Sequence, residues 1–281
     1  MPNDSDSTGV ELGKGEGIYL FCFARPPMPP VLNADGLDDR YSVSHQVFKD
    51  IMAVLSKVSI EEFCGPSADS RMKDISWVGP RACRHEEVIE KAMRQSPVLP
   101  ARFGTIFSSL EGLEKLVEMH HDTIRQFLDE VADKEEWSVK GLIDKAKAKE
   151  ELCLVMLSAE AERLASLSPG KRYFEEQRIR NNVEKEVNNW LKEVCKGIGK
   201  EFGRFASDFC ERKVLSREAT GLDADMILNW AFLIPRDLVQ DFRSRADEVN
   251  EDNKQKGLTL EVSGPWPPYS FCPALEMEPV L

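Results

Sequence analysis

The chain has 281 residues, of which 42% are hydrophobic and 31% charged. This balance is typical of a globular protein with one large domain or two ordinary ones. The formal net charge of -12 at pH 7 argues against nucleic acid as the main partner. No window approaches a membrane span of about 18 consecutive apolar residues. The seven cysteines form no Cys-x-x-Cys pair, so we expect reduced thiols in a cytoplasmic protein and no zinc ribbon.

The first elements are a polar leader and a buried strand. Residues 1–16 are polar and acidic, and we expect a disordered leader and not a secretory signal. Residues 17–24 (GIYLFCFA) are rich in aromatic and β-branched side chains and predict a strand, which ends at the prolines of residues 25–30. In residues 41–63 the apolar spacing also fits a helix, but the β-branched content favours two strands.

The stretch SPVLPARFGTIFSS, residues 96–109, is predicted to connect two helices. The first helix covers residues 81–96 and ends before Pro97, because a proline pushes the preceding residue out of the helical region. A short buried strand is expected at residues 101–107, with Gly104 where another backbone or ring packs closely.

The second of these helices is predicted over residues 110–132. Ser108 and Ser109 precede it, and serine is a preferred residue type at a helix N-terminus. The apolar side chains of the helix recur on one face; they are Leu110, Leu113, Leu116, Val117, Ile124, Phe127, Leu128 and Val131. This helix completes a predicted N-terminal α+β domain of residues 17–134.

The second half begins with a strand at residues 136–143, followed by helical residues 144–166 and a Ser-Pro-Gly break. A long amphipathic helix is predicted over residues 171–210. Its apolar residues, from Ile179 to Phe209, are three or four positions apart and so form a narrow stripe on one side.

Strands are predicted at residues 212–217 and 225–235, then a helix at 236–250 and a final strand at 257–264. Without the additional helix, the order of elements is the βαββαβ pattern of a ferredoxin-like fold. The predicted fold class is therefore α+β, with two domains of ferredoxin-like character, antiparallel sheets and a long amphipathic helix in the second half.

A tail is expected after the C-terminal ferredoxin-like domain, which we assign to residues 135–263. Residues 264–281 are rich in proline and aromatic residues. The side chains of Trp266, Tyr269 and Phe271 are candidates for protein binding. The alternative is that the tail packs on the chain itself, as a lid over the core of the second domain.

The histidines do not form a recognisable metal site. His85 and Glu86 invite comparison with His-Glu-x-x-His, but Ile89 stands where the second ligand would be, so we predict that His85 lies on a helix surface. His120 and His121 are adjacent and would point about 100° apart on a helix, which favours solvated or capping roles. The glycine-rich stretches lack the preceding strand of a nucleotide-binding loop. No catalytic, metal or cofactor residue is predicted.

Arg102 is the strongest single candidate for ligand binding. An arginine beside Gly104 is a combination that could hold an anion, but no other anion-binding element lies near it in the sequence. We favour the alternative that Arg102 forms an ion pair with Glu86, Glu87 or Glu90 of the preceding helix.

The chain resembles the GvpF/GvpL family of gas vesicle accessory proteins in four segments: GIYLFCFARP (17–26), RHEEVIEKAMRQSPVLPARFGTIFSS (84–109), FLDEVADKEEWSVK (127–140) and GPWPPYSF (264–271). The blocks PVLPARFGTIF and GPWPPYSF are the specific ones. The residues that define the first block are Pro97, Pro100, Arg102, Phe103 and Gly104.

The resemblance implies a gas vesicle assembly protein and not an enzyme. It implies two α+β domains of ferredoxin-like character, and binding to the hydrophobic shell subunit as a chaperone-like or minor structural component. The implied partners are the gas vesicle shell protein and other gas vesicle accessory proteins. The implied location is the cytoplasm, in association with gas vesicles. No cofactor, membrane or nucleic acid is expected. The alternative is a ligand-binding protein or enzyme on the same scaffold, which would need a pocket around Arg102.

Overall fold

The computed structural model describes residues 11–27, 35–37, 39–221 and 223–276. The chain divides into two compact units: Met1–Lys134 together with Trp266–Leu281, and Glu135–Pro265. Residues 1–10 of the predicted leader and residues 277–281 of the predicted tail lie outside the described residues.

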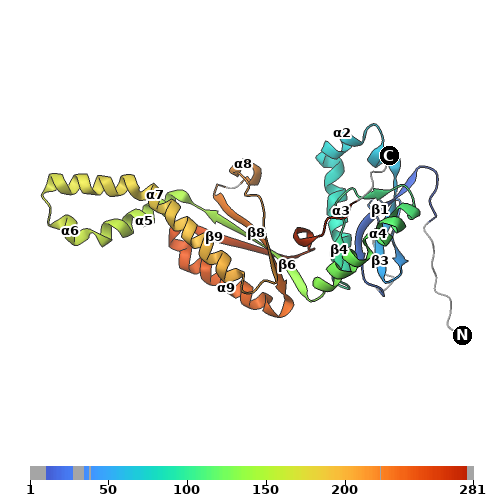
Figure 1. The fold of residues 1–281 in the computed structure, drawn as a ribbon. Helices are drawn as coiled ribbons and strands as arrows, with labels where there is room; N and C mark the ends of the chain where they lie inside the picture. Colours follow the sequence, from blue (N-terminus) through green and yellow to red (C-terminus); the bar gives the residue numbers. More distant parts are fainter. Residues whose placement is uncertain (1–10, 28–34, 38, 222, 277–281) are drawn as a thin grey trace. The chain divides into compact units, whose positions relative to one another are not determined.

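A sheet of five strands forms the centre of the first unit (Figure 1). β1 (Glu16–Ala24) pairs antiparallel with β3 (Ile51–Ser59), and β3 pairs on its other side with β2 (Val43–Phe48). β4 (Val98–Pro100) and β5 (Ile106–Phe107) pair with the free side of β1. The strand order is β2-β3-β1-β4, and the predicted strands at 17–24 and within 41–63 are confirmed.

The strand predicted at residues 101–107 is wrong over residues 101–105, because only Ile106–Phe107 form a strand there, β5. After β4 the chain turns, with the Thr105 N–H donating to the Arg102 carbonyl at 3.1 Å. Gly104 has a φ of +86°, which side chains other than glycine rarely adopt. A Cβ at Gly104 would meet only the Met72 Cε, at 3.9 Å. The glycine is therefore required by the turn, and not by close packing as predicted.

Two long helices cover the sheet of the first unit. α3 (Ile75–Met93) begins earlier than the predicted residue 81, because the Asp74 side chain caps it by accepting from the Ser76 N–H at 2.9 Å. α4 (Leu110–Glu130) is the helix predicted at 110–132, capped by Ser109 through the Gly112 N–H at 3.2 Å. Two short helices lie between β3 and α3: α1 (Ile60–Cys64) and α2 (Ala68–Lys73).

The core of the first unit forms on both faces of the sheet. Tyr19 and Phe21 of β1 pack with Val88 and Ile89 of α3 on one face. Because side chains alternate along a strand and all of β1 after its first residue is buried, the opposite face is covered too, and α4 packs there.

The second unit has a sheet of four strands in the order β7-β8-β6-β9. In chain order the elements are β6 (Lys134–Ile143), a helical excursion, β7 (Asp208–Glu211), β8 (Asp225–Pro235), α9 (Val239–Asn253) and β9 (Leu258–Trp266). This is the βαββαβ arrangement, so the predicted ferredoxin-like fold is confirmed. Smaller elements are α8 (Arg217–Thr220), η1 (Arg236–Leu238) and η2 (Lys254–Lys256), and η3 (Tyr269–Phe271) lies in the first unit.

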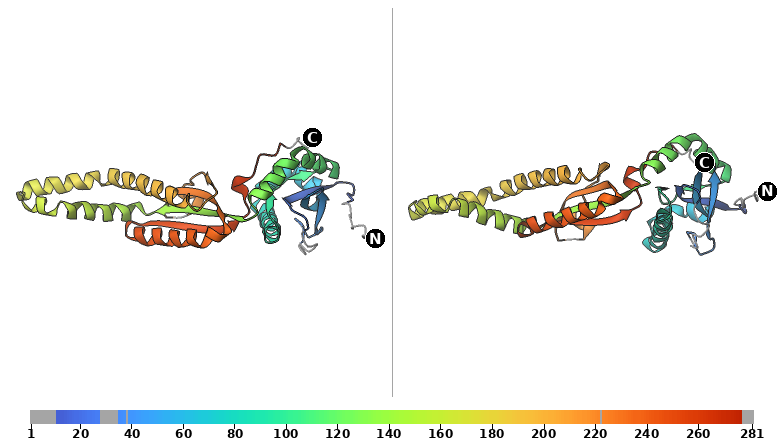
Figure 2. Two further views of the ribbon diagram at one scale, coloured as in Figure 1. Left: turned by 60° about the horizontal axis from the view of Figure 1, so that its bottom comes forward. Right: turned by 90° about the horizontal axis from the view of Figure 1, so that it is seen from below.

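The helical excursion is a hairpin that extends beyond the sheet of its unit (Figure 2). α5 (Lys145–Ala159) and α6 (Ala161–Ala165) lead to α7 (Pro169–Phe202), and α5 and α7 lie side by side. With 34 residues, α7 spans about 50 Å at 1.5 Å per residue. Only its second half packs on the core of the sheet, through Val187, Leu191, Ile198 and Phe202.

The predicted end of the long helix is wrong. α7 ends at Phe202, whereas Phe209 lies on β7 with its ring 5.1 Å from that of Phe232. Apolar residues remain three or four positions apart from α7 into β7, so their spacing does not indicate where the helix ends. The strand predicted at 212–217 is also wrong, since β7 covers Asp208–Glu211 and pairs with β8 there.

Candidate functional site

His85 lies at the centre of a buried polar cluster in the first unit. Its side chain is 1% exposed, so the predicted position on a helix surface is wrong. The Tyr19 hydroxyl lies 2.9 Å from Nδ1, and the Ala101 carbonyl lies 3.2 Å from Nε2. Burial lowers the pKa of His85 to about 4, so the imidazole is neutral at pH 7. A neutral ring that accepts from Tyr19 at Nδ1 and donates from Nε2–H to Ala101 satisfies both contacts.

The two specific sequence blocks meet at this histidine. The Gly104 N–H, from the first block, donates to the Tyr19 hydroxyl at 3.1 Å. Tyr269, from the second block, donates its hydroxyl to Glu86 Oε1 at 2.9 Å and lies 3.2 Å from His85 Nε2. Burial raises the pKa of both tyrosines, which keeps them protonated as donors.

This cluster holds three segments of the first unit together. Every polar side-chain atom of His85, Tyr19 and Tyr269 has a partner. Phe103 adds an edge-on ring contact to His85, with 5.7 Å between the ring centres. Among the described residues there is also no group of three or more potential metal ligands.

Arg102 does not take the role that the sequence predicted. Its side chain is exposed, and within the described part of the chain no ion pair includes it. Glu86 accepts from Tyr269, Glu87 pairs with Arg84 of the same helix, and Glu90 pairs with Arg94, the residue that follows the helix.

The C-terminal segment packs on the first unit. Tyr269 is one of the partly buried residues on the core of β1 and α3, so the predicted lid over the second core is wrong. Phe271 is partly buried, and Trp266 is 42% exposed. Of the three binding candidates in the tail, Trp266 is the most accessible.

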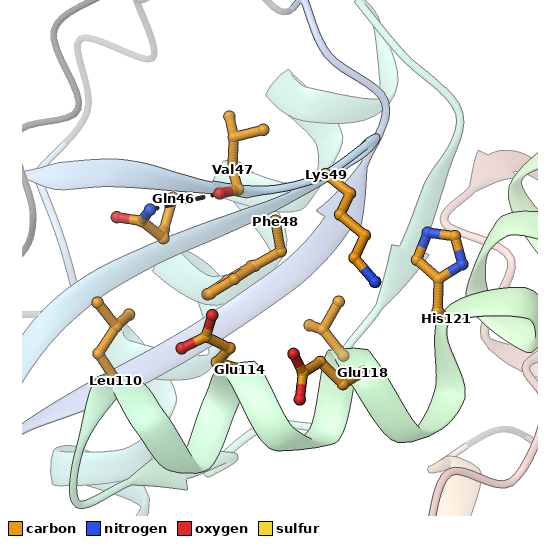
Figure 3. Close-up of a pocket in the computed structure, with 9 residues that line it drawn as sticks. Gln46, Val47, Phe48, Lys49, Leu110, Glu114, Glu118 and His121 are labelled. Carbon is orange, nitrogen blue, oxygen red and sulfur yellow. Dashed lines mark hydrogen bonds between the residues drawn. The ribbon is translucent and has the colours of Figure 1, made fainter.

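A groove lies between the end of β2 and α4, with a volume of about 310 Å³ (Figure 3). Phe48 from the strand and Leu110 and Val117 from the helix supply apolar lining. Glu114 and Glu118 line its helix side. The groove was not predicted from the sequence. The signals for it were the alternating pattern of residues 43–48 and two carboxylates four positions apart on the following helix.

Two residues bound one end of the groove. Lys49 has a φ of +58°, a conformation that costs a residue other than glycine about 1 kcal/mol. His121 Nε2 lies 2.6 Å from Asp50 Oδ1, and this carboxylate raises the pKa of His121. The neighbouring His120 has non-helical torsions, so α4 is kinked at this point.

The part of the helical hairpin beyond the sheet exposes apolar side chains. Leu154 and Val155 of α5 are more than half exposed, and Tyr173 and Phe174 of α7 are 59% and 73% exposed. Ion pairs surround the two rings, including Arg172 with Glu176 at 2.8 Å.

Comparison with known proteins places the chain in a family. The family described as "Gas vesicle synthesis protein GvpL/GvpF" matches residues 17–273. The chain belongs to this family. Among similar proteins, Gas vesicle protein L of Streptomyces sp. (strain CB03234) is 25% identical over 79% of this chain and 80% of that protein. Gas vesicle protein F of Dolichospermum flosaquae is 26% identical over 91% of this chain and 97% of that protein.

Solved structures of GvpF have the same fold as this GvpL/GvpF family member. The crystal structure of GvpF from Anabaena sp. PCC7120 has a TM-score of 0.67 at 20% identity and covers 94% of this chain and 98% of its own. The crystal structure of GvpF from Microcystis aeruginosa has a TM-score of 0.64 at 19% identity, and the match covers 92% of this chain and 99% of that chain. As a member of the GvpL/GvpF family, the chain is a gas vesicle accessory protein. None of its described helices is long and apolar enough to cross a membrane.

Proposed function

We propose that this chain binds the hydrophobic shell subunit of the gas vesicle during assembly, as a chaperone-like or minor structural component. The observation that carries the proposal is the family match over residues 17–273. A shell that encloses gas must be strongly apolar on one side, so its subunit needs a partner before assembly. Such a partner needs exposed apolar side chains or an open strand edge.

Exposed apolar residues of both units support the proposal. They lie on the edge strand β2, on the projecting hairpin and at the start of the C-terminal segment; they include Val47, Leu154, Val155, Tyr173, Phe174 and Trp266. Trp266 is retained in the proposed binding surface, whereas Tyr269 already bonds to Glu86. We further propose that the chain acts in the cytoplasm, at the gas vesicle, and that its role is binding without catalysis.

The test has a genetic and a biochemical arm. Deletion of the gene should abolish or deform gas vesicles in electron micrographs, and the tagged full-length chain should co-purify with the co-expressed shell subunit. Trp266→Ala is a better probe of the tail than truncation, because truncation also removes the Tyr269 contacts with His85. Normal vesicles in the deletion strain, together with no co-purification of the wild-type chain, would contradict the proposal.

A further inference from the structure

The helical hairpin of the second unit exposes an apolar residue on the outer side of α5. Residues 152–157 (LCLVML) are apolar all the way round the helix, a pattern typical of a helix that is covered on more than one side. The side that faces α7 is identified by Lys149, which pairs with Glu184 of α7 at 3.3 Å. Leu154 lies five positions further on, about 140° around the helix, and is 57% exposed. Leu154 therefore points away from α7.

Phe174 has the corresponding position on α7. Ile179 is buried although it lies in the half of α7 beyond the sheet, so α5 covers it. Phe174 lies five positions before Ile179, again about 140° around the helix, and it is exposed. The hairpin thus has two outer edges: an α5 edge that carries Leu154 and an α7 edge that carries Phe174 (Figure 2).

The α7 edge is basic. Residues three or four positions apart share one side of a helix, and the series through Phe174 is exposed and contains no carboxylate; it consists of Lys171, Phe174, Arg178, Asn181 and Lys185. The carboxylates of this half of α7 lie elsewhere, since Glu175, Glu176 and Glu186 are partly buried and Glu184 pairs with Lys149. Among the described residues, Lys171 and Lys185 form no ion pair within 4.0 Å.

The α5 edge is acidic beside its apolar residue. Glu150 and Glu151 lie four and three positions before Leu154, on the same side of the helix. Neither forms an ion pair within 4.0 Å with another residue that the structure describes. Lys147 is a base on this edge, one turn nearer the sheet. The two edges of the hairpin therefore have opposite charges beside similar apolar residues.

The edges also match in spacing. When two hairpins point in the same direction, α5 of one copy runs antiparallel to α7 of the other. With Leu154 placed against Phe174, Glu150 is level with Arg178, because each lies four positions from its apolar residue on the side nearer the sheet. Arg178 already pairs with Glu175 at 2.9 Å, but a guanidinium has five N–H donors and can bind a second carboxylate.

We infer that the α5 edge of one copy of this chain packs against the α7 edge of a second copy. Leu154 contacts Phe174, and Glu150 and Glu151 pair with Arg178. The net charge of -12 opposes self-association of this protein, whereas these edges bring opposite charges together.

The contact is heterologous, because the two edges lie on opposite sides of one hairpin. Each copy keeps one edge for a further copy, so association continues beyond two copies. The inference goes beyond the proposed function. It does not involve Val47 or Trp266, which stay in the proposed surface for the shell subunit.

The charge part is tested by sedimentation velocity of the purified full-length chain over a wide range of protein concentration. Glu150→Lys with Glu151→Lys reverses the α5 edge, and Lys171→Glu with Arg178→Glu reverses the α7 edge. Each double variant alone should raise the dissociation constant at least tenfold, because like charges then meet at the contact. An equal mixture of the two double variants should associate as the wild type does, since each reversed edge then meets a reversed partner.

The matched control for charge is Arg180→Glu. Arg180 is exposed on α7 but lies two positions after Arg178, on another side of the helix. This variant should associate within twofold of wild type. Circular dichroism verifies that all variants fold, and restored association in the mixture cannot arise from a variant that is unfolded.

The apolar part uses two adjacent exposed rings of α7. Phe174→Ser should weaken association at least tenfold, because it removes the side chain on the α7 edge. Tyr173→Ser is the control, since Tyr173 is also exposed but lies about 100° away around the helix. Its association should stay within twofold of wild type.

Two results would overturn the inference. One is a wild-type chain that sediments as a monomer at every concentration, including the case in which the shell subunit covers these edges instead. The other is a wild type that associates while the double variants associate equally well, or while their mixture stays monomeric. Neither result bears on capture of the shell subunit, which is measured separately.

Discussion

Gly104 determines how the connection between α3 and α4 is built. Its left-handed backbone turns the chain after β4, and the same turn places its N–H on the Tyr19 hydroxyl. That hydroxyl in turn contacts His85, so one glycine sets the position of a donor on which the buried cluster depends. At this scale, backbone conformation and side-chain hydrogen bonding are coupled.

Two glycine substitutions should therefore change stability in opposite directions. Gly104→Ala should lower the free energy of unfolding by about 1–2 kcal/mol through left-handed strain alone, because the space around it is open. Gly112→Ala, in the first turn of α4 with ordinary contacts at 3.8 Å, should raise it by about 0.5 kcal/mol. Urea unfolding of both variants tests this, and equal effects would contradict the role given to Gly104.

His85 should make stability depend on pH. An unfolded histidine has a pKa of about 6.5, and burial lowers that of His85 to about 4. Between these values the unfolded chain binds a proton that the folded chain does not, so the contribution is complete above pH 6.5 and is lost as pH falls toward 4. The difference corresponds to about 3 kcal/mol.

The measurement is urea unfolding of the wild type and His85→Leu between pH 7 and pH 4. The wild type should lose about 3 kcal/mol more than the variant over this range. Burial raises the pKa of Glu86, which acts in the opposite direction in both proteins and cancels in the comparison. Parallel curves would show that His85 is not buried in its neutral form.

At the scale of elements, α4 shows which signals specify a helix locally. Its N-terminus is set by Ser109, and its buried face by residues three and four positions apart. The end of α7 was not specified in this way, because the apolar stripe continues into β7 and only the pairing of β7 with β8 ends it.

The adjacent serines before α4 give a matched test of capping. Ser109→Ala removes the acceptor of the Gly112 N–H and should lower the free energy of unfolding by about 1 kcal/mol. Ser108→Ala, at an exposed position next to it, should change that free energy by less than about 0.5 kcal/mol. Thermal melts of the two variants distinguish them, and an equal loss would mean that Ser109 is not the cap.

At the scale of the molecule, the two units differ in how the chain builds them. The second is formed by one continuous stretch, Glu135–Pro265, whereas the first includes residues from both ends of the chain. Tyr269 connects the C-terminal segment to His85 and Glu86 within the first unit.

Fragments should therefore behave differently. A fragment of residues 135–265 should fold alone, with the circular dichroism of a mixed helix and sheet. A fragment of residues 1–134 should be less stable by about 2–3 kcal/mol than the same unit in the full chain, since it lacks the partly buried Tyr269 and its hydrogen bonds. A peptide of residues 264–276 added separately should restore that stability, and no effect of the peptide would contradict the role of this segment.

Elements whose signals are local could be predicted from the amino-acid sequence alone. The β-branched and aromatic run of β1, the capped face of α4 and the βαββαβ order of the second half needed no tertiary information, and the resemblance of the two specific blocks indicated the family that residues 17–273 match. These features depend on residue type and spacing within one segment.

Features that depend on contacts between distant segments could be recognised only in the folded chain. Burial of His85 requires Tyr19, Ala101 and Tyr269, which lie far from it in sequence or on other elements. The end of α7, the packing of the C-terminal segment on the first unit and the groove between β2 and α4 likewise arise from partners that no local pattern identifies. The stretch around Gly104 combines a local and a tertiary feature. Its prolines end a helix through local geometry, whereas the conformation of Gly104 allows its N–H to donate to the Tyr19 hydroxyl of β1.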